Sequence, residues 1–132
     1  MYKLFFIVFA NILLSSTLAC KKNNSSQGSG EAQLIISTDA LPYSEITGSS
    51  TGFNLTVESA MPPAGVRIQA IAKGETDNVN YFTGSIIETS AKTSNLTISN
   101  LPRQKICIVT VYVISISKSA NFATTIFRIV SK

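Results

Sequence analysis

Apolar and polar residues alternate with a period of two over most of the chain beyond residue 31. Residues 53–58 (FNLTVE) alternate without a fault, as a strand with one buried face does. Residues 66–70 (VRIQA) repeat the pattern, and residues 96–98 give a shorter copy. Residues 33–37 and 81–89 are expected to form outer strands. The pattern therefore predicts a series of short strands, most of which bury one face.

Two further segments predict the last strands of the fold. Residues 106–117 form a long run rich in β-branched residues, with Tyr112 inside it, and both faces of such a strand would be largely apolar. Apolar residues on both faces are typical of a strand that is covered on both sides, so a central strand is expected here. Residues 124–130 place Phe127 and Ile129 on one face and Arg128 on the other.

Turn-forming residues separate these segments. Glycine, proline, asparagine or aspartate residues are concentrated at residues 48–52, 61–64 and 74–80. No stretch combines an apolar repeat of 3.6 residues with helix-capping residues. Short strands with turn signals about every 8–12 residues are typical of a β-sandwich. The sequence therefore predicts an all-β fold, a single seven-stranded sandwich over residues 31–132.

Residues 95–102 (NLTISNLP) and 106–113 (ICIVTVYV) resemble the region of fibronectin type III domains that joins strand E to strand F. In those domains a leucine at the end of strand E is followed six residues later by an inward tyrosine and then by alternating apolar residues. Leu101 matches the leucine, and Cys107 stands at the tyrosine position. The alternating apolar positions are Val109, Val111 and Val113.

This resemblance implies an immunoglobulin-like or fibronectin type III-like sandwich. Those domains usually carry a tryptophan in strand B, and this chain contains none. Phe53 or Leu55 is therefore expected to fill the corresponding volume.

The first 19 residues have the three parts of a secretory signal peptide. Lys3 supplies a positive charge, and residues 4–14 (LFFIVFANILL) form an apolar run of eleven residues. Ser15, Ser16 and Ala19 are small residues near the expected cleavage point. The alternative is an uncleaved membrane helix, but a membrane span needs about 20 apolar residues.

Residues 17–20 (TLAC) resemble the lipobox, the cleavage and lipidation site of bacterial lipoproteins. Ala19 and Cys20 match this motif, whereas Thr17 and Leu18 depart from its usual residues. The resemblance implies that a peptidase cuts before Cys20 and that Cys20 then carries acyl chains, which together hold a protein firmly on a membrane. The expected location is the bacterial cell envelope, on the periplasmic or surface side of a membrane, with the outer membrane favoured.

The residues after Cys20 predict a tether. Residues 21–30 (KKNNSSQGSG) are polar and contain no apolar side chain to bury, so residues 20–30 are expected to form a lipidated cysteine with a flexible linker.

The positive charge of the chain belongs mostly to this N-terminal part. The formal net charge is +4, yet residues 31–132 contain eight Lys and Arg against seven Asp and Glu. Only Arg103 and Lys105 lie close together, in a short turn, where a solvated loop is a simpler interpretation than a phosphate site. A nucleic-acid partner is therefore not expected.

Few residues suit catalysis or tight metal binding. The chain has no histidine, so a Ser–His pair and an imidazole ligand are both excluded. Cys107 has apolar neighbours and is expected to be a buried, inert packing residue. We expect neither an enzyme nor a cofactor.

Two candidate sites remain open. Residues 75–80 (ETDNVN) form an oxygen-rich loop that could bind calcium, although asparagine and aspartate also favour an ordinary hairpin turn. A sugar or small ligand would need exposed aromatic side chains. The candidates for that role are Tyr43, Tyr81, Phe82 and Phe122.

The sequence favours a lipid-anchored β-sandwich that acts as a non-enzymatic interaction or structural module, with the membrane and an envelope or surface protein as its partners. Within this class, the strands at 106–117 and 124–130 could join neighbouring subunits of a fibre by strand addition. The alternative is a lipoprotein that binds a small ligand or carbohydrate in a concave site.

Overall fold

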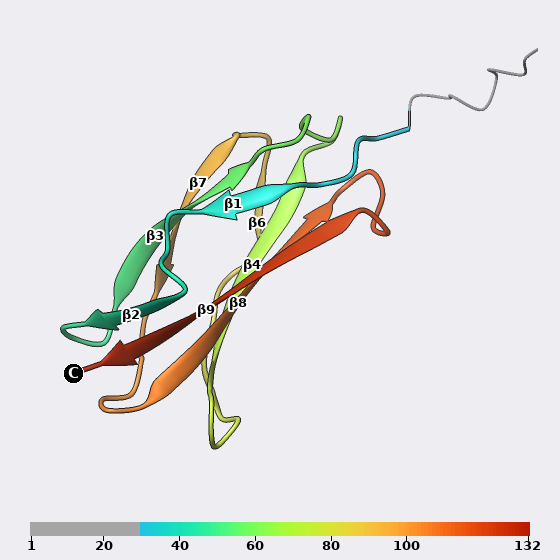
Figure 1. Cartoon of the computed structure of the whole chain (residues 1–132). Coiled ribbons are helices and arrows are strands. Elements are labelled where there is room, and N and C mark those ends of the chain that lie inside the picture. The colour runs from blue at the N-terminus through green and yellow to red at the C-terminus, as the bar shows by residue number, and fades with distance from the viewer. Residues whose placement is uncertain (1–29) are drawn as a thin grey trace, which may run out of the picture. The chain divides into compact units, whose positions relative to one another are not determined.

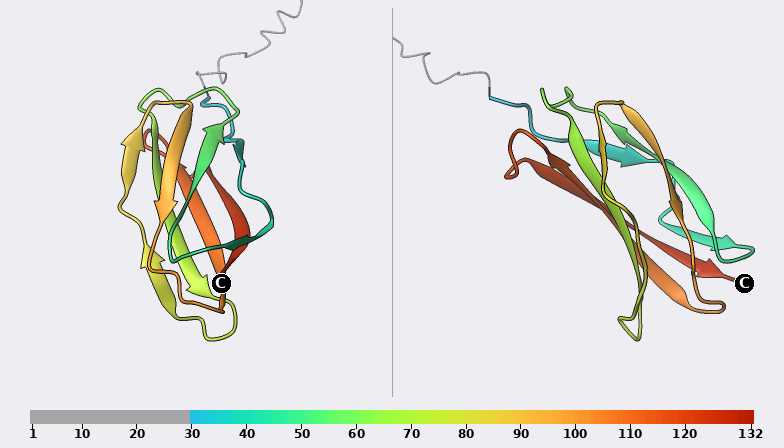
Figure 2. Two further views of the ribbon diagram at one scale, coloured as in Figure 1. Left: turned by 90° about the vertical axis from the view of Figure 1, so that its left-hand side faces the viewer. Right: turned by 180° about the vertical axis from the view of Figure 1, so that it is seen from behind.

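The computed structural model describes residues 30–132, of which Glu31–Lys132 form a compact unit. Two sheets pack face to face in this unit (Figures 1 and 2), with the orders β1-β3-β7 and β2-β9-β8-β4-β5, and β6 also pairs with β4. The all-β sandwich predicted from the sequence is therefore confirmed. The strands are β1 Ile36–Thr38, β2 Tyr43–Ile46, β3 Thr51–Val57, β4 Val66–Gly74, β5 Asn80–Thr83, β6 Ile87–Thr89, β7 Thr93–Ile98, β8 Ile106–Ser115 and β9 Phe122–Ser131.

The predicted signal peptide (residues 1–19), the lipidation site Cys20 and the tether up to residue 29 lie outside the described residues. From residue 30 onward, the fold contains no helix long and apolar enough to cross a membrane.

The inward side chains of both sheets form one apolar core. Phe53 on β3 meets Phe127 on β9 edge to face, with ring centroids 4.9 Å apart, and so joins the two sheets. Leu55 is 1% exposed, and burial of such a side chain contributes about 1.5–3 kcal/mol. Phe53 and Leu55, the two residues expected to replace the absent tryptophan, are thus both buried in the core. Leu101, Cys107, Val109, Val111 and Val113 are also buried, as the fibronectin-like pattern predicted.

The nine strands of residues 30–132 occupy seven strand positions, because the first and the fourth positions are each divided between two short strands. The first strand begins in the small sheet as β1, antiparallel to β3, and continues in the large sheet as β2, parallel to β9. The change of sheet occurs around Pro42, which has no N–H to donate and whose carbonyl accepts a hydrogen bond from the Arg128 N–H (3.0 Å). β2 was missed from the sequence.

The predicted strand at residues 81–89 is interrupted around Gly84, and its two parts, β5 and β6, both pair with β4. The interruption remains attached to β4, because the Gly84 N–H donates to the Ala70 carbonyl (2.8 Å) and the Gln69 side chain donates to the Gly84 carbonyl (3.0 Å). β5 and β6 together therefore form one edge of the large sheet.

The first described residues are fixed to the turn between β8 and β9. The buried Asn121 side chain accepts a hydrogen bond from the Leu34 N–H (2.8 Å) and donates to the Ala32 carbonyl (2.8 Å) and to the Glu31 carboxylate (2.5 Å). Ser117 also donates to Glu31 (2.6 Å). We call this end of the sandwich the proximal end. The opposite end, with the β4–β5 hairpin and Lys132, is the distal end (Figure 1).

Candidate functional site

The hairpin between β4 and β5 places the acidic residues of the 75–80 segment at the distal end. The Gly74 N–H donates to the Val79 carbonyl (2.9 Å), and the Asn78 N–H donates to the Gly74 carbonyl (3.0 Å). Asn78 has a φ of 54°, a left-handed conformation that asparagine tolerates better than most residues. A Cβ atom at Gly74 would collide with the Asp77 carboxylate. The backbone of the hairpin thus holds Asp77 directly over Gly74.

An irregularity in β5 directs Tyr81 toward this hairpin. β4 and β5 pair Ala72 with Phe82 and Lys73 with Asn80, so Tyr81 is an extra residue on β5. Such a bulge re-aims the side chain that it carries. The body of Tyr81 packs against the core while its hydroxyl reaches Asp77.

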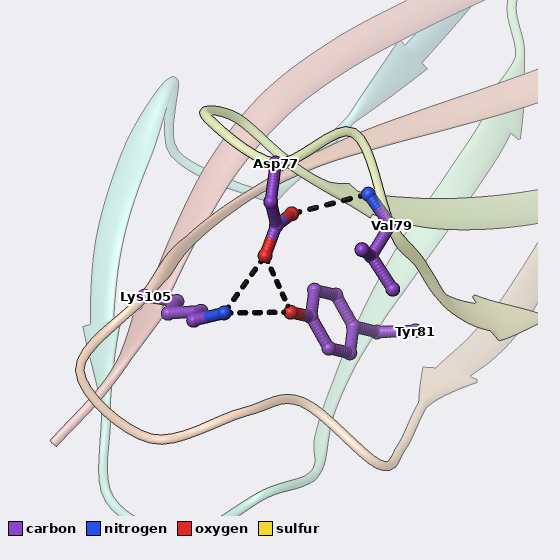
Figure 3. A network of polar contacts seen from close by, with 4 residues as sticks. All are labelled: Asp77, Val79, Tyr81 and Lys105. Atoms are coloured by element: carbon purple, nitrogen blue, oxygen red, sulfur yellow. Dashed lines mark hydrogen bonds and ion pairs between the residues drawn. The ribbon is translucent and has the colours of Figure 1, made fainter.

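Asp77, Tyr81 and Lys105 form a closed polar network with the Val79 backbone (Figure 3). One carboxylate oxygen of Asp77 accepts hydrogen bonds from Lys105 Nζ (2.7 Å) and the Tyr81 hydroxyl (2.7 Å), and the other accepts from the Val79 N–H (3.1 Å). Lys105 Nζ also donates to the Tyr81 hydroxyl oxygen (3.0 Å). Hydrogen bonds from Lys105, Tyr81 and the Val79 N–H lower the pKa of Asp77 strongly. The hydrogen bonds of Lys105 to Asp77 and Tyr81 raise the pKa of Lys105.

The network connects the hairpin to the residues before β8 and leaves little room for a cation. Calcium takes 6–8 oxygen ligands, but both oxygens of Asp77 have partners, and Glu75 pairs with Arg128 (2.6 Å). No three His, Cys, Asp or Glu side chains of the described part of the chain are placed to hold a metal ion. This geometry favours the hairpin-turn interpretation. Lys105 is exposed as expected, but its amine is held by Asp77.

The four aromatic candidates for a ligand site do not share a cavity. Tyr43 lies on β2 and Phe82 on β5, at opposite edges of the large sheet. Tyr43 is aligned with Arg128 of β9, six residues from Phe122, which corresponds to about 20 Å along a strand. Phe82 lines a groove between β5, β6 and β7, and Tyr81 belongs to the polar network.

Cys107 is a buried free thiol on β8. Burial raises its pKa, so that the reactive thiolate is disfavoured. Its position agrees with the packing role expected from its neighbours.

The outer surface of the large sheet carries the most distinctive group of exposed side chains. On β8 and β9 the residues that point away from the core include Tyr112 (40% exposed), Phe122 (56%) and Ile126 (60%). Cross-strand pairing aligns Ile114 with Phe122 and Thr110 with Ile126, so these side chains form one continuous surface. We call this surface the apolar face. It consists of Ile71, Ile86, Tyr112, Ile114, Phe122 and Ile126.

The apolar face is uneven. A cavity of about 360 Å³ lies over β4, beside β8. Phe122 and Ile126 protrude from β9, on the other side of β8. The face therefore contains both a hollow and projecting apolar side chains. The hollow is lined by Arg67, Ile68, Gln69, Ile71, Ile86, Tyr112 and Ile114.

Ion pairs border the apolar face on two sides. Arg67 pairs with Glu88 of β6 (2.6 Å) at the proximal side. Glu75 follows β4 and pairs with Arg128 of β9 (2.6 Å), so this ion pair crosses over β8 near Ile108. The apolar face thus lies on the proximal side of the Arg128–Glu75 pair.

The sequence contained a signal for this face, but we interpreted it differently. The run at 106–117 is apolar on both faces, from which we predicted a central strand. β8 is indeed central in its sheet, between β4 and β9. However, Ile106 and Tyr112 stay exposed, because no other part of residues 30–132 covers the outer surface. The predicted central position is confirmed, and the apolar residues on the outer surface of β8 are left without a cover from the same sandwich.

No protein-family model matches this chain, and no curated protein matches it. Its fold is similar to that of a chain in the solved structure described as "Structural basis of T cell specificity and activation by the bacterial superantigen toxic shock syndrome toxin-1". The two chains are 7% identical, the match covers 75% of this chain and 99% of that one, and the TM-score is 0.50. At this identity the likeness concerns the fold alone.

Proposed function

We propose that this protein is a lipid-anchored, non-enzymatic interaction module of the bacterial cell envelope and that a protein partner binds its apolar face. The observation that carries the proposal is the exposure of Tyr112, Phe122 and Ile126 on one continuous surface. The largest contiguous apolar patch on a monomeric soluble protein is typically about 300–600 Å², and such a patch is often a functional site.

The N-terminal sequence supports the anchor. Cys20 lies in a lipobox-like motif, and residues 21–30 provide a polar linker that ends where Glu31 meets Asn121 at the proximal end. Ten linker residues of this composition span about 15–20 Å on average. In this proposal the linker leaves both sheets of the sandwich free to meet a partner at the membrane.

The non-enzymatic part of the proposal is supported by side-chain chemistry. The chain has no histidine, and the carboxylate of Asp77 and the amine of Lys105 neutralise each other in the distal network. A general base needs a pKa near the working pH. The hydrogen bonds of these two groups to each other and to Tyr81 lower the pKa of Asp77 and raise the pKa of Lys105, so both pKa values move away from pH 7.

A photo-crosslinking amino acid at position 112 tests the partner site. In native membranes, Tyr112→benzoylphenylalanine is expected to capture a protein upon irradiation. The matched control is Thr97→benzoylphenylalanine, at an exposed position on the outer surface of the small sheet. Capture at neither position, or equal capture at both, would overturn the proposed role of the apolar face.

Mass spectrometry of the mature protein tests the anchor separately. We expect Cys20 to be the first residue and to carry acyl chains, and we expect membrane attachment to be lost in Cys20→Ala. An unmodified chain that begins at another residue would contradict the anchor, but it would leave the crosslinking result to be judged independently.

The alternative function, binding of a small ligand, is favoured by one observation. The hollow over β4 has about 360 Å³, within the range of about 300–1,000 Å³ found for ligand pockets. Its lining by Ile71, Ile86 and Ile114 fits an apolar ligand better than a sugar. Native mass spectrometry of the protein released from its membrane tests this function. Ligand binding predicts a bound small molecule on the wild type and its loss from the Ile71→Lys variant.

A further inference from the structure

We propose that the partner on the apolar face is a second copy of this chain, packed face to face about a two-fold axis that runs along β8. This inference rests on the proposed function, because it names the occupant of the same surface. Three properties of the face support it: its shape, its charges and its size.

The shape of the face is complementary to itself. β8 lies between β4, which carries the hollow, and β9, which carries the projecting side chains. Rotation about an axis along β8 therefore places β9 of each copy over β4 of the other. Ile126 lies in the same cross-strand row as Ile71, since both are aligned with Thr110. Each Ile126 would thus meet Ile71 of the second copy.

Phe122 would make an equivalent contact two rows nearer the proximal end. It shares a row with Arg67 and Ile114, and Arg67 and Ile114 line the hollow. The ring of Phe122 would enter the hollow of the second copy and stack on the Arg67 side chain. A patch that carries both the projection and its own receptor is what an isologous dimer interface requires.

The charges of the face allow two copies to approach. Arg67 and Arg128 would disfavour burial and repel basic groups of the second copy if they were uncompensated, but each holds a carboxylate at 2.6 Å. Lys73 lies at the distal border of the face. In the dimer it would lie opposite the Arg128–Glu75 pair of the second copy, where the Glu75 carboxylate can compensate its positive charge. The surface thus offers no strong field that would favour an oppositely charged partner.

The size of the face fits a weak dimer. Three rows of side chains span about 20 Å along the strands, and four strands span a similar width, so each copy offers about 400 Å². A total of about 800 Å² lies below the range of about 1,200–2,000 Å² typical of stable complexes. Copies that share one membrane surface gain effective concentration, so the contact is expected to form mainly between anchored copies.

Thiol crosslinking in native membranes tests this pairing. Thr110→Cys places a thiol on β8, next to the proposed axis, and Thr97→Cys places one on the outer surface of the small sheet. A short bismaleimide is expected to link Thr110→Cys into a species of twice the chain mass, and to leave Thr97→Cys as single chains. Cys107 is buried, and the chain without an added cysteine controls for it and for Cys20.

A second substitution ties the crosslink to the apolar face. Ile126→Lys in the Thr110→Cys background is expected to reduce the dimer by about tenfold or more, because a lysine would be buried against an apolar hollow. Ile126 is 60% exposed in the single chain, so this variant should fold, and circular dichroism checks that it does.

The outcomes separate this inference from the proposed function. If position 112 captures a different protein while Thr110→Cys stays monomeric, the second copy is overturned and the interaction module stands. If neither position yields any adduct, both are overturned. Equal dimer from Thr110→Cys and Thr97→Cys would show crowding rather than a specific face, and would also overturn the pairing.

Discussion

The outer surfaces of the two sheets expose different side chains to solvent. The small sheet presents threonine and asparagine, and its outward side chains bond to one another: Asn95 donates to Asn54 (3.1 Å), and the hydroxyls of Thr56 and Thr93 are 3.2 Å apart. The large sheet presents isoleucine, tyrosine and phenylalanine at the equivalent outward positions of β8 and β9. Both sheets bury the same kind of inner surface.

This difference separates the side chains that the fold requires from those that it does not require. An antiparallel sheet with one solvated face normally alternates apolar and polar residues, and β3 does so, with Phe53, Leu55 and Val57 buried. Folding of the sandwich therefore explains the inner residues of both sheets. It does not explain apolar residues on the outer surface of β8 and β9, which points to a second requirement such as binding.

The largest expected effect on stability distinguishes a buried from an exposed isoleucine of the same strand. Ile129 of β9 points inward and is 2% exposed, whereas Ile126 of the same strand points outward. Ile129→Ala is expected to lower the free energy of unfolding by about 2–5 kcal/mol, and Ile126→Ala to change it by about 0.5 kcal/mol or less. Urea denaturation measures both. Similar losses would mean that the apolar face is needed for folding.

The next largest effect concerns a polar side chain that is buried. Asn121→Ala removes the partner of the Leu34 N–H and of the Ala32 carbonyl, and should cost about 1–3 kcal/mol because a buried donor loses its acceptor. The same denaturation experiment measures this loss. A change close to zero would show that water replaces the amide and that Asn121 is not essential for fixing residues 31–34.

A smaller loss of stability is expected at low pH, from the Asp77 network at the distal end. Hydrogen bonds from Lys105 and Tyr81 lower the pKa of Asp77 below its ordinary value of 3.8. The stability that Asp77 contributes is complete above the pKa of the unfolded chain and is lost as the pH falls below it. We expect the wild type to lose more stability than Asp77→Asn between about pH 5 and about pH 2.5. Parallel pH profiles for the two proteins would contradict this.

The smallest effect is expected on the polar surface of the small sheet. Asn95→Ala removes the exposed hydrogen bond to Asn54, and water can replace it, so the change in unfolding free energy should be about 0.5 kcal/mol or less. A loss comparable to that of Asn121→Ala would mean that the two asparagines contribute equally despite their different burial.

Most of the fold could be predicted from the sequence because burial imposes a local pattern. Alternation located β3, β4, part of β7 and β9, the run rich in β-branched residues located β8, and turn residues located the hairpin after Gly74. β2 was missed because its four residues are largely exposed and carry no such pattern. Edge strands that pair with one neighbour only are weakly marked in this way.

The candidate sites could be predicted only in part. Asp77, Tyr81 and Lys105 were each noted, but as members of different groups, because Asp77 and Lys105 are 28 residues apart and meet only through the packing of strands. The apolar face was visible in the run at 106–117. Periodicity alone does not distinguish a surface covered by the same chain from one left for a partner.

The path of the first strand has a mechanical consequence. Glu31 lies at the proximal end and Lys132 at the distal end, and β2 runs parallel to β9. Tension between these two residues would pull β2 and β9 in opposite directions along their length. Their hydrogen bonds would then share the load at the same time, instead of opening one after another as in a zipper. A domain held by its N-terminus would in this way resist force at the strand pair that joins its two ends.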